Sequence, residues 1–130
     1  MRFPVFGMSA VASLALASAA YAQADAVDEG NDRFDRNDFE GAIASYSRAI
    51  VLDPRFSVAY ARRGRAWRKK GDLDKAIQDL DHAIGLNDRD FWSFRERGLI
   101  YLAKPDFEKA VADFDKAPSS AVATCAMPSR

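Results

Sequence analysis

Basic side chains are concentrated in one short stretch of the sequence. Six cations occupy nine residues with no acidic residue among them: Arg62, Arg63, Arg65, Arg68, Lys69 and Lys70. A cluster of this density can bind an acidic partner, because guanidinium and ammonium groups pair with carboxylates. A second explanation stays open. The last three cations end a predicted helix, where the helix dipole favours positive charge, and long cationic stems also cover apolar surface.

The other reactive side chains form no recognisable catalytic or metal-binding set. One histidine, His82, and one cysteine, Cys125, cannot build a structural zinc site, and a single cysteine cannot form an internal disulfide. Neither a Gly-rich phosphate loop nor a Ser–His–Asp set is present. The sequence therefore predicts no enzyme activity and no cofactor or metal.

Three pairs of acidic residues resemble fragments of a calcium loop, but none has the required run with a glycine and a distant glutamate. We interpret them instead as solvated helix faces and helix caps: Asp79/Asp81, Asp88/Asp90 and Asp113/Asp115.

The composition is that of one small folded domain. The chain has 130 residues, of which 48% are hydrophobic, and its 19 basic residues balance 19 acidic ones. This apolar content excludes wholesale disorder, and the length is too short for two independent cores. The absence of net positive charge argues against a nucleic-acid partner.

The sequence repeats itself with a fixed 34-residue period and no insertion. Glycines, alanines and aspartates recur at this spacing, together with two series of bulky residues: Gly30/Gly64/Gly98, Ala42/Ala76/Ala110, Ala49/Ala83/Ala117, Asp38/Asp72/Asp106, Phe39/Leu73/Phe107 and Tyr46/Leu80/Phe114. A fixed period of this length indicates a stack of identical supersecondary units.

The repeated unit should be a pair of helices. Apolar residues in 57–70 and in 73–86 follow the i, i+3/i+4, i+7 spacing of an amphipathic helix. Gly64 and Gly98 are unfavourable inside a helix, so we expect them where two helices approach too closely for a side chain. Trp67 should lie in the core.

The start and end signals fit the same helices. Asp38, Asp72 and Asp106 stand where a second helix would begin and can cap its free N–H groups. Gly71 suits the left-handed backbone conformation that commonly ends a helix, and Asn37 tolerates that conformation. Pro105 does not tolerate it, so we expect a different turn in the third unit.

The period and residue types resemble the tetratricopeptide repeat family. The small residue in the first helix falls on Gly30, Gly64 and Gly98, and the Ala-x-x-x-aromatic pattern of the second helix falls on Ala42/Tyr46 and Ala110/Phe114. The resemblance implies an all-α, right-handed superhelical stack of antiparallel helical hairpins. It divides the chain into repeats at 23–56, 57–90 and 91–118, the last one shortened, and a tail at 119–130.

The resemblance also implies a function. In this family the first helices line a concave groove that binds a protein or peptide, without catalysis. The corresponding residues here are Asn31, Phe34, Arg65, Arg68, Lys69, Trp92 and Arg95. The family's chaperone-binding members clamp a carboxylate with Lys and Asn residues. Asn31 matches one of them, but Val27 replaces a Lys and Arg62 an Asn.

The first residues have the composition of a secretory signal. Residues 3–24 carry no charge, are rich in Ala and Ser, and end in Ala20-Tyr21-Ala22. This pattern predicts cleavage between Ala22 and Gln23 and an exported protein, periplasmic in a Gram-negative bacterium and otherwise secreted. An uncleaved membrane anchor is the alternative, because about 20 apolar residues can span a bilayer.

The end of the third unit predicts an incomplete stack. Pro118 stops the last helix, and residues 119–130 offer little to cover Phe107, Val111 and Phe114. We therefore expect the isolated chain either to be marginally stable or to self-associate through the third repeat, with Cys125 available for cross-linking. The chain as the front piece of a larger repeat assembly is the alternative.

Overall fold

Six helices and no strand make up residues 6–117, which the computed structural model describes, with side chains from residue 17 onward. They are α1 (Phe6–Asp35), α2 (Phe39–Leu52), α3 (Ser57–Lys70), α4 (Leu73–Leu86), α5 (Phe91–Ala103) and α6 (Phe107–Lys116). The helices predicted at 57–70 and 73–86 are confirmed.

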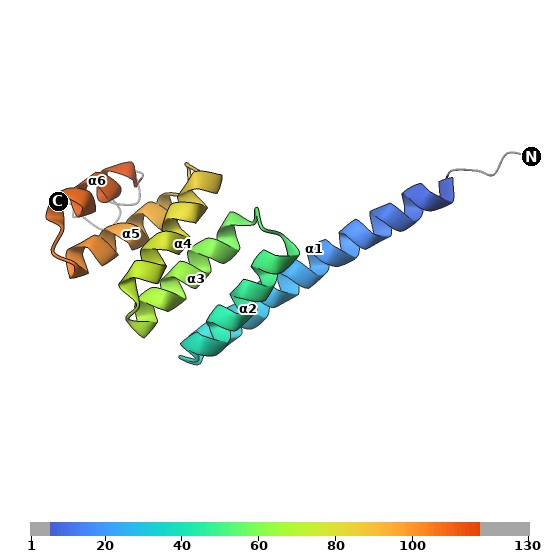
Figure 1. Ribbon diagram of the computed structural model, residues 1–130, viewed down its shortest axis with the longest axis horizontal. Coiled ribbons are helices and arrows are strands. Elements are labelled where there is room, and N and C mark those ends of the chain that lie inside the picture. Colours follow the sequence, from blue (N-terminus) through green and yellow to red (C-terminus); the bar gives the residue numbers. More distant parts are fainter. Residues whose placement is uncertain (1–5, 118–130) are drawn as a thin grey trace, which may run out of the picture.

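The six helices form three antiparallel hairpins that stack in sequence order (Figure 1). Within a hairpin α1 packs on α2, α3 on α4 and α5 on α6. Between hairpins α3 packs on α2 and α5 on α4. The expected all-α stack of helical hairpins is confirmed.

The second helix of each hairpin begins at a capping aspartate. The carboxylate of Asp38 accepts a hydrogen bond from the Gly41 N–H at 2.9 Å, and Asp72 and Asp106 do the same for Lys75 and Lys109. Each cap satisfies a backbone donor that the helix leaves free. The predicted starts of these three helices are therefore confirmed.

The repeated glycines lie where the two helices of a hairpin touch. A Cβ atom added to Gly30 would come within 2.5 Å of the Tyr46 ring, and one added to Gly98 within 2.8 Å of the Phe114 ring. At Gly64 it would meet the Leu80 side chain at 3.0 Å and a backbone carbonyl oxygen at 3.2 Å. The periodic glycine thus marks the closest approach of each helix pair.

The turns inside the hairpins share one hydrogen bond and differ in another. Asn37 and Gly71 have positive φ angles, of 64° and 100°, and Pro105 at the same position has a φ of 22°. Each turn keeps the bond from the next aspartate N–H to the carbonyl five residues earlier. Pro105 has no N–H, so the third turn lacks the second bond that Asn37 and Gly71 donate. The expected difference is a lost bond within a similar turn.

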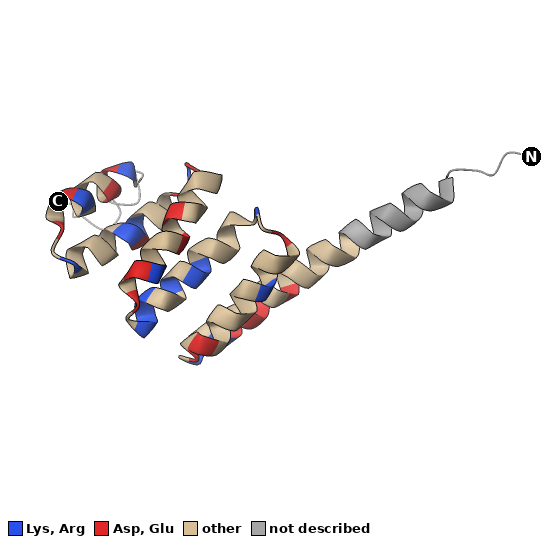
Figure 2. Cartoon of the chain, viewed as in Figure 1, with Lys and Arg blue, Asp and Glu red and all other residues tan. Residues whose placement is uncertain are grey.

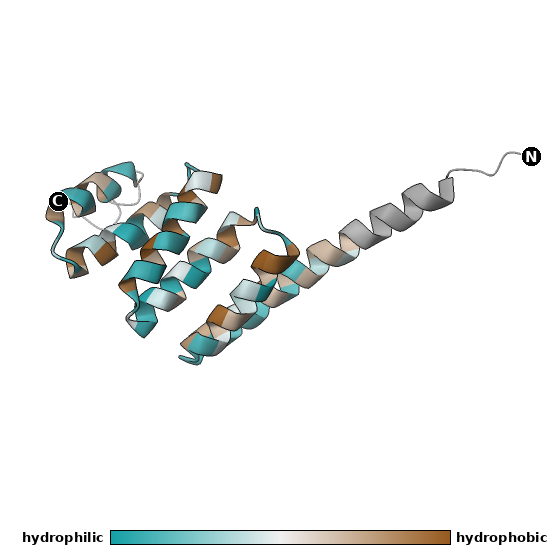
Figure 3. Ribbon diagram, viewed as in Figure 1, coloured by the Kyte–Doolittle hydropathy of each residue, from teal (hydrophilic) through white to brown (hydrophobic). Residues whose placement is uncertain are grey.

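Small apolar residues form the centre of the stack. Alanines are fully buried between the helices, and larger residues such as Leu80 and Ile100 fill the wider spaces. Trp67 is half-buried against this last group, which confirms its predicted place in the core. Hydrophobic and hydrophilic residues alternate along the helices of the stack (Figure 3).

Helix α1 is longer than its counterparts and projects beyond the stack (Figure 1). From residue 17 onward, Ala26 is the first buried residue, and Ala22, at the predicted cleavage site, is exposed on the projecting part. Among the helices that the structure describes, none is long and apolar enough to cross a membrane. The predicted tail, with Pro118 and Cys125, lies outside the described residues.

Candidate peptide-binding groove

Charge is sorted by helix in the middle hairpin. Basic residues gather on α3 and acidic ones on the adjacent α4 (Figure 2). The cations of α3 are not equivalent, because some are held by acids of neighbouring helices and others are not.

Arg63 is part of the packing of the stack. Its guanidinium donates two hydrogen bonds of 2.7 Å to the carboxylate of Asp79 and a third of 3.0 Å to the Ser47 hydroxyl. One repeat later, Arg97 binds Asp113 in the same two-pronged way and also reaches Asp81. The hydrogen bonds to these carboxylates raise the pKa of both arginines, so both stay charged.

These pairs correct one prediction. Asp79 and Asp113 are buried, with 6% and 4% of their surface exposed, and are not on a solvated helix face. A carboxylate can be buried at this point because a bidentate guanidinium compensates its charge. Asp81 and Asp115 are exposed, as predicted.

Two more cations of α3 pair with neighbouring hairpins. Arg68 binds Glu96 of α5 at 2.9 Å, and Lys70 binds Glu40 of α2 at 2.8 Å. Glu96 is nearly fully buried, so Arg68 is tied to the inside of the stack although the sequence placed it among the binding residues.

Arg62 and Arg65 are the cations that face two adjoining pockets. The first pocket, of about 260 Å³, is lined by residues of α1, α2 and α3: Asn31, Phe34, Asp35, Tyr46, Arg62 and Arg65. The second, of about 230 Å³, lies between α3 and the start of α5: Val58, Ala61, Arg62, Arg65, Asp90 and Trp92. Both arginines line both pockets, so the two pockets adjoin at Arg62 and Arg65, and we call them together the groove of α1, α3 and α5.

The groove arginines have unused hydrogen-bonding capacity. The Nε atoms of Arg62 and Arg65 are buried and have no hydrogen-bond partner in the described part of the chain. A buried donor without an acceptor is costly, by about 1–3 kcal/mol, and the cost disappears when an acceptor is supplied. Neither arginine forms an ion pair within the described residues, so the rest of each guanidinium can pair with an acidic group in the groove.

Aromatic rings flank Arg65 on both sides. Its guanidinium carbon lies 4.6 Å from the centre of the Phe34 ring and 6.0 Å from that of Trp92. Such contacts stabilise a cation and hold its plane in place. The rings therefore orient Arg65 within the groove.

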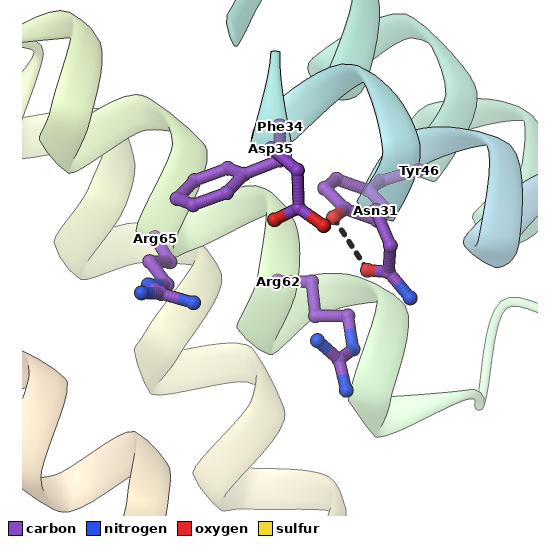
Figure 4. A pocket seen from close by; sticks show the side chains of 6 residues that line it. All are labelled: Asn31, Phe34, Asp35, Tyr46, Arg62 and Arg65. Carbon is purple, nitrogen blue, oxygen red and sulfur yellow. Dashed lines mark hydrogen bonds between the residues drawn. The ribbon is translucent and has the colours of Figure 1, made fainter. Parts of the chain in front are cut away.

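The opposite wall of the first pocket is polar. The Tyr46 hydroxyl donates a hydrogen bond of 2.7 Å to Asn31 Oδ1, which leaves the Asn31 amide NH2 free to donate (Figure 4). Burial raises the pKa of the Tyr46 phenol, so it remains a neutral donor at neutral pH. The Asp35 carboxylate lies on the same wall.

The structure thus brings together Asn31, Phe34, Arg65 and Trp92 of the predicted set. Lys69 and Arg95 are exposed and line neither pocket. Sequence reasoning did not include Arg62 in this set, although it lies three residues before Arg65 and so shares its helix face.

Among the described residues no three His, Cys, Asp or Glu side chains come together as metal ligands would. His82 is exposed, as predicted, and its ring stacks on Tyr60 with 4.2 Å between ring centres.

Comparison with known proteins now identifies the family. A family model described as tetratricopeptide repeat matches residues 27–91, half of the chain. The chain therefore belongs to the tetratricopeptide repeat family. The match ends where α5 begins, and no significant match was found among curated proteins.

Solved structures support the same fold. The chain is similar to MamA, with 26% identity over 73% of the chain and a TM-score of 0.70, but spans only 56% of that structure. The second TPR of Spaghetti (RPAP3), bound to the HSP90 peptide SRMEEVD, is 27% identical over 73% of this chain and 88% of its own, with a TM-score of 0.71. A complex of the TPR2B domain of yeast Sti1 with pHsp70 shares the fold, with a TM-score of 0.74 at 22% identity over 76% of this chain and 79% of that one.

Proposed function

We propose that the chain is an exported, non-catalytic scaffold of three tetratricopeptide repeats that binds an acidic segment of a protein or peptide in the groove of α1, α3 and α5. The observation that carries this proposal is that Arg62 and Arg65 line both pockets and form no ion pair within the described residues, whereas Arg63, Arg68 and Lys70 do. The first of these pockets is also lined by Asn31, whose amide NH2 can donate a hydrogen bond.

The relatives support a peptide as the bound partner. The Spaghetti repeat was solved with a peptide that carries two glutamates and an aspartate, SRMEEVD. In this chain Arg62 and Arg65 provide the positive charge for such a segment, and Phe34 and Trp92 provide apolar surface beside it. The partner we propose is therefore acidic with adjacent apolar residues.

The groove is tested by reversing charge where the two pockets meet. We expect Arg62→Glu with Arg65→Glu to weaken binding of an acidic peptide at least tenfold, or about 1.4 kcal/mol, because attraction becomes repulsion. The probe is the tightest peptide selected by the purified chain from a random displayed library, and the measurement is fluorescence anisotropy. The selected peptides should be rich in Asp and Glu.

The matched control is Lys69→Glu with Arg95→Glu, which changes the net charge equally on α3 and α5 but outside both pockets. Its affinity should stay within about threefold of the original, since exposed charges at a rim contribute little. Equal losses from the two pairs, or selection of basic peptides, would show that the groove is not the acidic-segment site.

The proposed export predicts where the signal sequence is cleaved. We expect the exported protein to begin at Gln23, because Ala20-Tyr21-Ala22 has the small-x-small form that signal peptidases cleave. Ala22→Leu should cause the uncleaved precursor to accumulate. Mass spectrometry of the exported fraction measures both. An intact Met1 start in the unaltered protein, or retention in washed membranes, would favour the membrane anchor instead.

A further inference from the structure

The hairpins of this chain are joined by two polar contacts that recur from one repeat to the next. The first is a hydrogen bond from an arginine to the second helix of the preceding hairpin: Arg63 to Ser47 at 3.0 Å and Arg97 to Asp81 at 2.6 Å. The donor is the Nη1 group both times. The second helix of each hairpin therefore presents an acceptor to the first helix of the next.

The second contact lies seven residues further along the same helix. Lys70 binds Glu40 at 2.8 Å, and Lys104 binds Asp74 at 2.7 Å. Between the arginine and the lysine, Ala66 and Ile100 are fully buried against the preceding hairpin. A docking helix is thus defined by Arg-x2-apolar-x3-Lys.

The third hairpin presents both acceptors, and no described helix packs against them. Asp115 stands one full repeat after Asp81, and Glu108 stands one full repeat after Asp74. Both are exposed and neither has an ion-pair partner among residues 17–117. On α6, therefore, the two acidic groups of the interhairpin contact are present and their basic partners are missing.

The apolar part of the contact is also present and uncovered. Leu73 and Ile77 are half-buried in the cluster that includes Ile100 of the next hairpin. Their counterparts on α6 are Phe107 and Val111, which are 62% and 59% exposed. The predicted exposure of these two residues is confirmed, and they lie on the same helix as Glu108 and Asp115.

We propose that the outer face of α6, formed by Phe107, Glu108, Val111 and Asp115, docks an amphipathic helix of a partner protein that carries an arginine and, seven residues later, a lysine, with an apolar residue between them. This surface is separate from the groove of α1, α3 and α5, so the inference does not depend on the proposed function.

The sequence predicts self-association through the third repeat, but a second copy of this chain stacked head to tail does not fit this face. Head-to-tail stacking would bring α1 of one copy onto α6 of the next. At the second contact Arg36 would meet Glu108 favourably. At the first contact, however, Glu29 stands one repeat before Arg63 and would face Asp115. Like charges at the first contact oppose this assembly. The sequence of residues 118–130 also lacks the basic pair, since its only charged residue is Arg130.

The test uses a helix whose docking geometry this chain already contains. The probe is a fluorescent synthetic peptide with the sequence of residues 91–104, with Gly98→Ala and a side-chain cross-link to hold it helical, because so short a helix is marginal alone in water. Anisotropy with the full mature chain should show saturable binding. Glu108→Lys with Asp115→Lys should weaken it at least tenfold.

Charge exchange separates this docking from nonspecific adsorption. A peptide with Arg97→Glu and Lys104→Glu should bind the Glu108→Lys, Asp115→Lys chain and not the original one. Asp28→Lys with Asp32→Lys makes an equal change of charge on exposed residues of α1 and should leave binding of the first peptide unchanged. The groove variant, Arg62→Glu with Arg65→Glu, should also leave binding of this peptide unchanged. Absence of binding, indifference to the α6 reversal, or sedimentation as a dimer that the α6 reversal dissociates would overturn the proposal.

Discussion

Replacing Gly64 by leucine is expected to destabilise the fold by about 3 kcal/mol or more, in the range measured for overpacked or strained cores. A Cβ at this position would lie 3.2 Å from the carbonyl oxygen of Ala76 and 3.0 Å from the Leu80 side chain. The carbonyl belongs to the backbone of α4 and cannot rotate away, so α3 and α4 would have to separate. Urea unfolding followed by circular dichroism measures the change.

Gly85 is the matched control, because a Cβ there would have no heavy atom within 4 Å. Gly85→Leu should leave stability unchanged or raise it by up to about 1 kcal/mol, since leucine favours the helix more than glycine does. A loss below about 0.5 kcal/mol for Gly64→Leu would mean that the two helices do not pack closely at this residue.

The fold was predictable because each hairpin repeats the same contacts. A contact that recurs in space must recur in sequence. The glycine at each close approach and the aspartate at the start of each second helix therefore appear once in every repeat. The same periodicity located the ends of α3 and α4 to the residue. Local propensity and packing agree in these elements, which is the condition for prediction from sequence.

The buried acids were not predictable by the same reasoning. In sequence, Asp79 and Asp113 look like parts of solvated acidic pairs, because hydropathy assigns every carboxylate to the polar face of a helix. Their partners Arg63 and Arg97 lie 16 residues earlier on a different helix. The joint recurrence of the arginine and the aspartate was the available signal, and only the packing of the two helices turns it into a contact.

The candidate site was partly predictable for a similar reason. The resemblance to tetratricopeptide repeats implies that Arg65 lies on the inner face together with Asn31, one repeat earlier. The sequence could not divide the six cations of α3 into those held inside the stack, such as Arg63 and Arg68, and those facing the groove, such as Arg62. That division depends on where the acids of α2, α4 and α5 lie.

Removing the Asp79 carboxylate should be the second most damaging change. In Asp79→Ala, Arg63 keeps only its bond to Ser47, while its side chain is 23% exposed and so poorly placed to regain water. Breaking a fully buried pair costs about 3–5 kcal/mol, and partial exposure lowers our expectation to about 2–3 kcal/mol. Asp74→Ala is the control on the same helix. Its pair with Lys104 is exposed, so the free energy of unfolding should hardly change.

A double-mutant cycle separates the pair from the charge that a single substitution leaves behind. If the cost of Asp79→Ala comes from an uncompensated guanidinium, then Arg63→Met in the same chain should recover part of it, because methionine keeps the apolar stem without the charge. The pair of Asp113 and Arg97 should show the same kind of coupling. Asp113→Ala should cost less than Asp79→Ala, because Arg97 keeps the Asp81 carboxylate as an acceptor. Additive losses from Asp79→Ala and Arg63→Met would mean that the two groups stabilise the stack independently, and that Arg63 contributes by packing rather than by its bond to the carboxylate.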